Sequence, residues 1–91
     1  MMMTKKEMMS EVEWMNVFAG NLRSLMDEEN MSQNELARRT GISKGTISRY
    51  LSARCMPSVN ALVNIANVFK GCDINDLLYF YEPMELRPSR R

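Results

Sequence analysis

The chemistry that this sequence offers is concentrated in a short basic segment near its middle. Residues 32–55 hold five Lys and Arg side chains and one Glu, whereas the whole chain of 91 residues holds 12 basic and 11 acidic side chains. Lys44 and Gly45 stand one helical turn before Ser48 and Arg49, so the four residues share one face if the segment is a helix. Arg49 can donate two hydrogen bonds to O6 and N7 of guanine, and Lys44 can bind guanine less rigidly or contact a phosphate. The charge pattern indicates a basic patch that could meet nucleic acid, with a solvated charged face as the simpler alternative.

Several other kinds of chemistry are disfavoured. The chain has no His, which is the commonest general base and the commonest metal ligand in proteins. Cys55 and Cys72 lie far apart in the sequence and make no ligand set, and without a secretion signal they indicate reduced thiols. No stretch approaches the roughly 18 apolar residues that cross a membrane. We therefore expect a cytoplasmic protein that is not an enzyme, carries no cofactor or metal and does not contact a membrane.

Helices must position the basic face, because apolar residues recur at three- and four-residue steps along most of the chain. The first predicted helix runs from Glu11 to about Glu29, with Ser10 as its N-cap and Asn30 as a left-handed end. Its apolar face consists of Trp14, Phe18, Leu22, Leu25 and Met26.

Two short helices and a tight turn hold the basic segment itself. Ser32 and Glu35 form the pattern of a capping box, which predicts a second helix that ends just before Gly41, a residue that favours a left-handed turn. Ser43 then caps a third helix over residues 44–52. The side chains of this third helix that are expected to point inward are Ile47, Tyr50 and Leu51.

The remainder of the chain predicts two more helices. Ser58 caps a fourth helix that ends near Gly71, and Asp73 caps a fifth helix that Pro83 stops. No segment shows the alternation of a strand, so the sequence predicts an all-α fold. The expected apolar stripe of the fourth helix consists of Val59, Leu62, Val63, Ile65, Ala66 and Phe69.

The order of helix, turn and helix over residues 32–51 is the layout of a helix-turn-helix unit, whose second helix presents its N-terminal residues to the DNA major groove. The sequence resembles the Cro/Xre-type helix-turn-helix domain of phage repressors and bacterial regulators. The resemblance rests on the residues S-Q-x-E-L-A-x-x-x-G-I-S-x-x-T-I-S-R, followed by Pro57-Ser58, L-x-x-I-A-x-x-F and D-I-N-D-L-L. The resemblance covers about residues 14–81. It implies a compact five-helix, lambda-repressor-like DNA-binding domain over residues 11–82. Residues 1–10 are Met-rich and polar with no fixed period, so we expect a flexible arm there, and we expect a disordered tail over residues 83–91.

The resemblance also implies sequence-specific binding of double-stranded DNA by a transcriptional regulator, most often a phage or bacterial repressor that occupies its operator. In the family, the position of Gln33 touches the DNA backbone and braces the first side chain of the recognition helix. Arg38 and Arg39 either flank the backbone or keep their helix soluble, and Gly45 allows a close backbone approach. The expected DNA-binding residues are Gln33, Ser43, Lys44, Gly45, Thr46, Ser48, Arg49 and Arg54.

The chain departs from the family pattern at two positions. Leu51 stands where the family often has a Glu that pairs with an Arg, and the position of that Arg is Met26 here. Because both positions are apolar, the ion pair is replaced as a unit and we expect Met26 to touch Leu51. Ala53 stands where the family often has Gly, so a left-handed turn there would strain its Cβ.

Residues 77–81 are five consecutive apolar or aromatic residues, and a small domain buries only one side of such a helix. We therefore expect a homodimer on a near-palindromic operator, with Trp14 beside an interface of Tyr79, Tyr81, Met84 and Leu86. Alternatively, Met84 and Leu86 fold back over the monomer's own core. Two other functions stay open, an antitoxin with a toxin partner and a protein-interaction module that has lost DNA binding.

Overall fold

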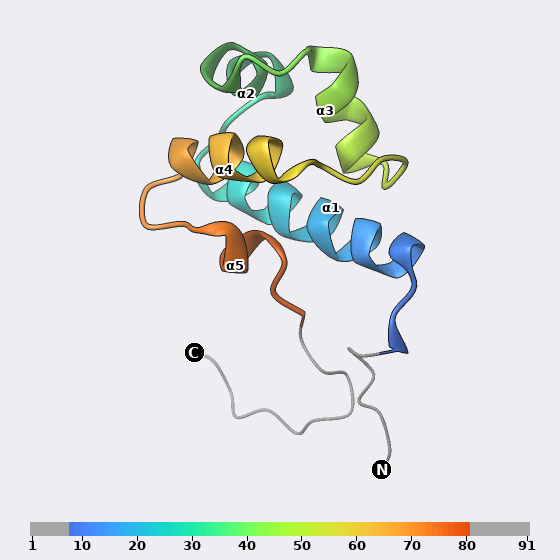
Figure 1. Cartoon of the computed structure of the whole chain (residues 1–91). Helices are drawn as coiled ribbons and strands as arrows, with labels where there is room; N and C mark the ends of the chain where they lie inside the picture. The colour runs from blue at the N-terminus through green and yellow to red at the C-terminus, as the bar shows by residue number, and fades with distance from the viewer. Residues whose placement is uncertain (1–7, 81–91) are drawn as a thin grey trace.

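The computed structural model describes residues 8–80, which form five helices and no strand. Figure 1 shows α2 and α3 at one end of the domain and α5 towards the other, with α1 and α4 between them. Helix α3 packs against α1 and α2, whereas α4 packs against α2 and α5, and α5 packs against α1. The predicted all-α fold is confirmed. The helices are α1 (Glu11–Glu28), α2 (Gln33–Thr40), α3 (Lys44–Leu51), α4 (Val59–Val68) and α5 (Ile74–Leu77).

Each helix begins after a polar residue whose side chain accepts a hydrogen bond from a backbone N–H of the first turn, which satisfies one of the unpaired donors there. In α1 and α5 the cap is reciprocal, because the third helical residue, Glu13 or Asp76, accepts from the backbone N–H of the cap. The predicted capping box at Ser32 is only half formed. Ser32 Oγ accepts from the N–H of Glu35, but the Glu35 carboxylate bonds to two arginines and does not reach back. The predicted caps observed are Ser10, Ser32, Ser43, Ser58 and Asp73.

One core joins all five helices. The Phe18 ring on α1 meets the Tyr50 ring on α3 edge to face, with centroids 5.4 Å apart, and this contact adds to the burial that fixes α3 on the domain. Every helix supplies at least one side chain with no exposed surface, so the position of α3 depends on the packing of the whole domain. These side chains are Phe18, Leu22, Leu36, Ile47, Ile65 and Leu77.

Two details of the predicted helices were wrong. Val59 and Val63 are 70% and 39% exposed, because the buried stripe of α4 is centred near Leu62 and Ile65 and leaves both valines outside it. Helix α5 is a single short turn. The side-chain amide of Asn21 on α1 donates to the carbonyl oxygens of Leu77 and Tyr79, at 2.8 and 3.0 Å, and holds the chain there in a non-helical path.

Some predictions fall outside the described residues. These are the tail over residues 83–91, most of the arm over residues 1–10, and the proposed interface residues Tyr81, Met84 and Leu86. Within residues 8–80, no helix combines the length and the apolar character needed to cross a membrane.

Candidate nucleic-acid interface

A three-residue turn fixes how α3 follows α2. Gly41 ends α2 in the left-handed conformation, with φ of 78°, and its N–H donates to the carbonyl of Ala37 at 2.9 Å. The Thr40 hydroxyl donates to the Leu36 carbonyl at 2.8 Å and accepts from the N–H of Ile42 at 3.1 Å. Ile42 packs against the core, so the turn is anchored on both sides before α3 begins. This geometry is the predicted helix-turn-helix arrangement.

Helix α3 has one buried face and one exposed face. Ile47, Tyr50 and Leu51 are buried in the core. Thr46 is half-buried at the boundary between the two faces. The exposed side consists of Lys44, Gly45, Ser48 and Arg49, the face that the sequence predicts for base contacts.

Hydrogen bonds along the exposed side of α3 connect three of the predicted site residues. The Ser43 hydroxyl donates to Thr46 Oγ1 at 2.9 Å, and the same oxygen accepts from Nη2 of Arg49 at 3.3 Å. Ser43 Oγ also accepts from the backbone N–H of Thr46 as the N-cap. The Arg49 guanidinium is therefore drawn along the helix towards its N-terminal end, which is the end that enters a groove in helix-turn-helix complexes.

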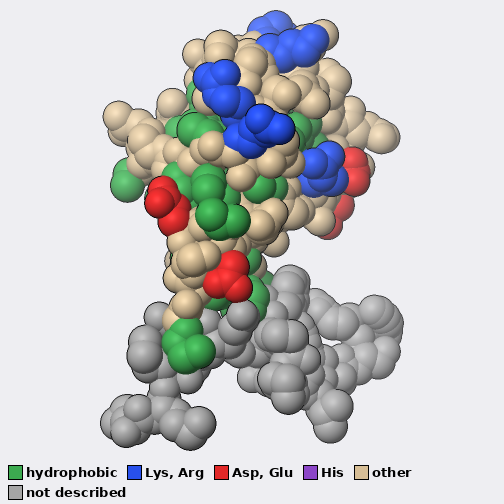
Figure 2. All heavy atoms as spheres, turned by 90° about the vertical axis from the view of Figure 1, so that its right-hand side faces the viewer, with side chains coloured by type: hydrophobic (Ala, Val, Ile, Leu, Met, Phe, Trp, Pro, Cys, Tyr) green, Lys and Arg blue, Asp and Glu red, His purple; other side chains and the backbone are tan. Residues whose placement is uncertain are grey.

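The cations of this face have no carboxylate partner among residues 8–80. Lys44, Arg49 and Arg54 form no ion pair there, whereas both ion pairs of this part of the chain converge on Glu35 of α2. Figure 2 shows Lys and Arg side chains gathered over the upper part of the face on the α3 side, with Asp and Glu side chains lower down and towards both edges. Unpaired cations on one surface attract polyanions.

In the loop after α3, Ala53 adopts the left-handed conformation for which the sequence predicts strain at its Cβ. Ala53 has a φ of +59°, its N–H donates to the Tyr50 carbonyl at 3.1 Å, and the N–H of Arg54 donates to the Arg49 carbonyl at 2.9 Å. These two bonds form a Schellman motif, whose left-handed position is usually Gly. The motif places Arg54 directly beyond the end of α3, with an exposed side chain.

Gln33 lies on the other side of the turn, half-buried at the first position of α2. It lines a shallow cavity of about 210 Å³ together with Arg23, Met26 and Leu51. Met26 and Leu51 are both buried in one core cluster and line the same cavity, and their direct contact stays a prediction.

Sequence reasoning missed Arg23. Its Nη2 atom donates to the carbonyl oxygen of Leu51 at 2.8 Å and ties the end of α3 to α1. The available signal was its position, since it stands three residues before Met26 and therefore on the same side of α1.

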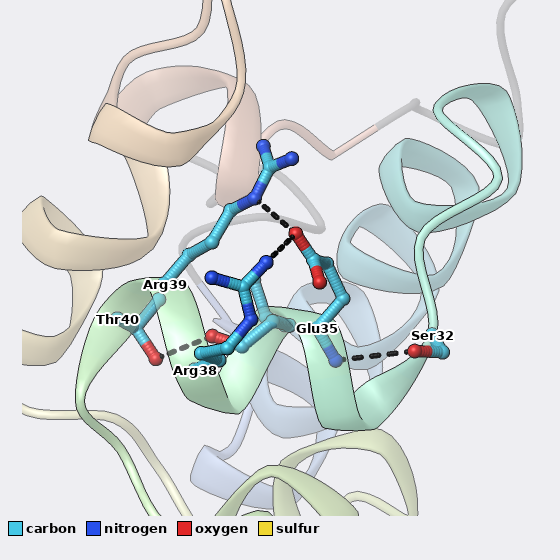
Figure 3. A network of polar contacts seen from close by, with 6 residues as sticks. Ser32, Glu35, Arg38, Arg39 and Thr40 are labelled. Atoms are coloured by element: carbon cyan, nitrogen blue, oxygen red, sulfur yellow. Dashed lines mark hydrogen bonds and ion pairs between the residues drawn. The ribbon is translucent and has the colours of Figure 1, made fainter.

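Arg38 and Arg39 are oriented towards a partner on their own helix. Arg38 Nη2 and Arg39 Nε donate to the same oxygen of Glu35, at 2.5 and 2.6 Å, as Figure 3 shows. The hydrogen bonds from Arg38, the larger cause, and from Arg39 hold the pKa of the Glu35 carboxyl below its usual value.

An apolar groove of about 540 Å³ lies between the start of α1, the loop before α4 and the end of α5. Trp14 and Tyr79 line it together, which is the juxtaposition expected from the sequence. Tyr79 is 55% exposed. The remaining lining residues are Met56, Asn75 and Leu78.

Comparison with known protein families matches residues 22–77, more than half of the chain, to the family described as Helix-turn-helix. The match begins within α1 and ends with α5, so it includes the turn and both helices of the candidate interface. Searches among curated proteins and among solved structures returned no match.

Proposed function

Because the chain belongs to the helix-turn-helix family, with a DNA-binding domain of the Cro/Xre type, we propose that it is a sequence-specific repressor, of phage or bacterial origin, that acts by occupying its operator. The observation that carries the proposal is the exposed side of α3, where Lys44 and Arg49 have no carboxylate partner within residues 8–80. A recognition helix needs cations that are free to reach base edges and phosphates.

Each exposed residue of the interface has a specific proposed role. Arg49 reads guanine through two hydrogen bonds, and Lys44 binds either a base or a phosphate. Ser48 contacts a base or its sugar from the same face. Gly45 lets the helix backbone approach DNA closely. Packing within the protein does not require Gly here, because a Cβ would meet no atom beyond its own helix neighbours within 4 Å. The phosphate contacts are assigned to Gln33, Ser43, Thr46 and Arg54.

We propose that the protein binds its operator as a homodimer, in which the second copy supplies a second recognition helix. One α3 of eight residues spans too few base pairs to specify an operator, and a two-fold pair matches a near-palindromic site. The groove lined by Trp14, Leu78 and Tyr79 supports this proposal, because it offers apolar surface on an element other than α3. The dimer therefore leaves both α3 faces available to DNA.

As a repressor, the protein is proposed to be cytoplasmic and non-enzymatic, and to act only by occupying its operator. The test is a selection of bound sequences from random double-stranded DNA with the wild-type chain. We expect enrichment of one half-site in two inverted copies, with centres about one helical turn apart. Recovery of unenriched sequences would contradict sequence-specific binding, and enrichment of a single half-site would contradict the dimer.

A further inference from the structure

Glu35 behaves differently from the acidic residues at the equivalent position of α1 and α5. In α1 and α5 the acidic residue at the third helical position, Glu13 or Asp76, returns a hydrogen bond to the N-cap backbone. In α2, Glu35 stands at that position after a well-formed Ser32 cap, and its carboxylate turns to Arg38 and Arg39. Figure 3 shows both guanidinium groups directed at one carboxylate oxygen. Two cations thus outcompete one backbone donor for this carboxylate.

The charge of the basic segment is consequently divided into two parts. The cluster of Glu35, Arg38 and Arg39 carries a net charge of +1, with its two guanidinium groups bonded to a carboxylate. The α3 side carries Lys44, Arg49 and Arg54 with no acidic partner among the described residues. Only the second part is free to replace the counterions that surround DNA phosphates.

Building on the proposed DNA binding, we infer that Glu35 is a positioning residue that withholds Arg38 and Arg39 from the DNA backbone. Charge-assisted bonds of 2.5 and 2.6 Å direct the Arg38 and Arg39 side chains, which are 70% and 49% exposed, to a carboxylate on their own helix. Releasing them towards phosphates would leave the Glu35 carboxylate unpaired on a helix whose first turn is assigned to the DNA backbone. The cationic phosphate contacts of each chain then come from α3 and the loop after it.

The salt dependence of DNA binding measures this directly, because its slope counts the phosphates that cations neutralise, at about 0.9 per phosphate. We expect Glu35→Gln to steepen the slope by up to about 1.8 per chain, as two arginines become available. The variant keeps the Ser32 cap, and Gln is compatible with this position of a helix start. Between 50 and 200 mM salt, its affinity should fall about tenfold more than that of the wild type for each chain bound to the duplex.

A cycle with the arginines separates the release of Arg38 and Arg39 from a general change of charge. Replacing Arg38 and Arg39 by Ala should leave the wild-type slope unchanged and should remove the extra slope of Glu35→Gln. The matched control is Glu29→Gln, which removes one negative charge from an exposed residue that forms no ion pair within residues 8–80. An unchanged slope in Glu35→Gln, or a shallower slope when the arginines are removed from the wild type, would overturn the inference. A wild type that binds no duplex at low salt would instead overturn the proposed function, and this inference with it.

Discussion

The guanidinium group of Arg23 on α1 donates a 2.8 Å hydrogen bond to the carbonyl oxygen of Leu51, the last residue of α3. The bond satisfies one of the carbonyls that the end of a helix leaves unpaired, and it places a cation at the negative end of the helix dipole. It also joins the proposed reading helix to the longest helix of the domain. The orientation of α3 is thus fixed from outside the helix-turn-helix segment.

Replacing Arg23 by Leu should lower the free energy of unfolding by about 1 kcal/mol, since the side chain is exposed and exposure weakens charged hydrogen bonds. Specific DNA affinity should fall with it, because the end of α3 is no longer held by α1. Urea unfolding and duplex titration measure the two effects, and Arg23→Lys is the control that keeps the charge but loses the planar fork. Unchanged stability and affinity in Arg23→Leu would show that the bond does not position α3.

Met26 and Leu51 are expected to touch across the boundary between α1 and α3. Leu51→Ala should cost about 2–5 kcal/mol of stability, because the side chain is buried in the core. Leu51→Glu should be worse, unless Met26→Arg accompanies it and restores an ion pair. A double-mutant cycle by urea unfolding measures the coupling, and independent effects of the two changes would argue against the contact.

Replacing Gly45 tests the close approach of α3 to DNA, because the expected changes in stability and in DNA affinity have opposite signs. Gly45→Ala should stabilise the free protein by up to about 1 kcal/mol, because Ala is the better helix former and its Cβ would meet no atom beyond its own helix neighbours within 4 Å. The same change should weaken DNA binding by crowding the groove. Gly20→Ala on α1, where a Cβ also meets nothing, is the matched control that should stabilise the protein without affecting DNA. DNA binding equal to wild type in Gly45→Ala would remove the proposed role of this residue.

The proposed dimer predicts that a charge in the apolar groove separates the two copies. Tyr79→Asp should shift sedimentation from dimer to monomer, since the carboxylate would lose its hydration in the interface. Val59→Asp is the control, because Val59 is 70% exposed on α4 and does not line the groove. Trp14 fluorescence reports the same step, as it is the single Trp of the chain and lines the groove. A wild type that stays monomeric at high concentration and on an operator-length duplex would rule out the dimer.

The features that the sequence predicts correctly are mostly local. A Ser or Asp followed by a helical pattern specifies its own cap, and Gly41 specifies its own left-handed turn, so the helix starts and the turn between α2 and α3 could be located without a structure. The exposed side of α3 also follows from its spacing alone. Ala53 adopts the left-handed conformation that Gly usually takes at such a position, because two backbone hydrogen bonds specify the turn there.

The features that could not be predicted depend on competition or on distant contacts. The Glu35 carboxylate has three possible local partners, and the pattern of a capping box does not say which of them bind it. The bond from Arg23 to Leu51 depends on how α1 crosses α3. The early end of α5 depends on Asn21, which is 56 residues from Leu77 in the chain.

The central claim is sequence-specific binding through α3, and the most direct measurement of it is a titration of the wild-type chain with the selected duplex and with a scrambled duplex of equal length at physiological salt. We expect the selected duplex to bind at least about 1,000-fold more tightly. Arg49→Ala should lose about 1–3 kcal/mol on the selected duplex and relax the preference at one base pair, whereas Arg54→Ala should weaken both duplexes alike. Equal affinity of the wild type for the two duplexes would contradict the account.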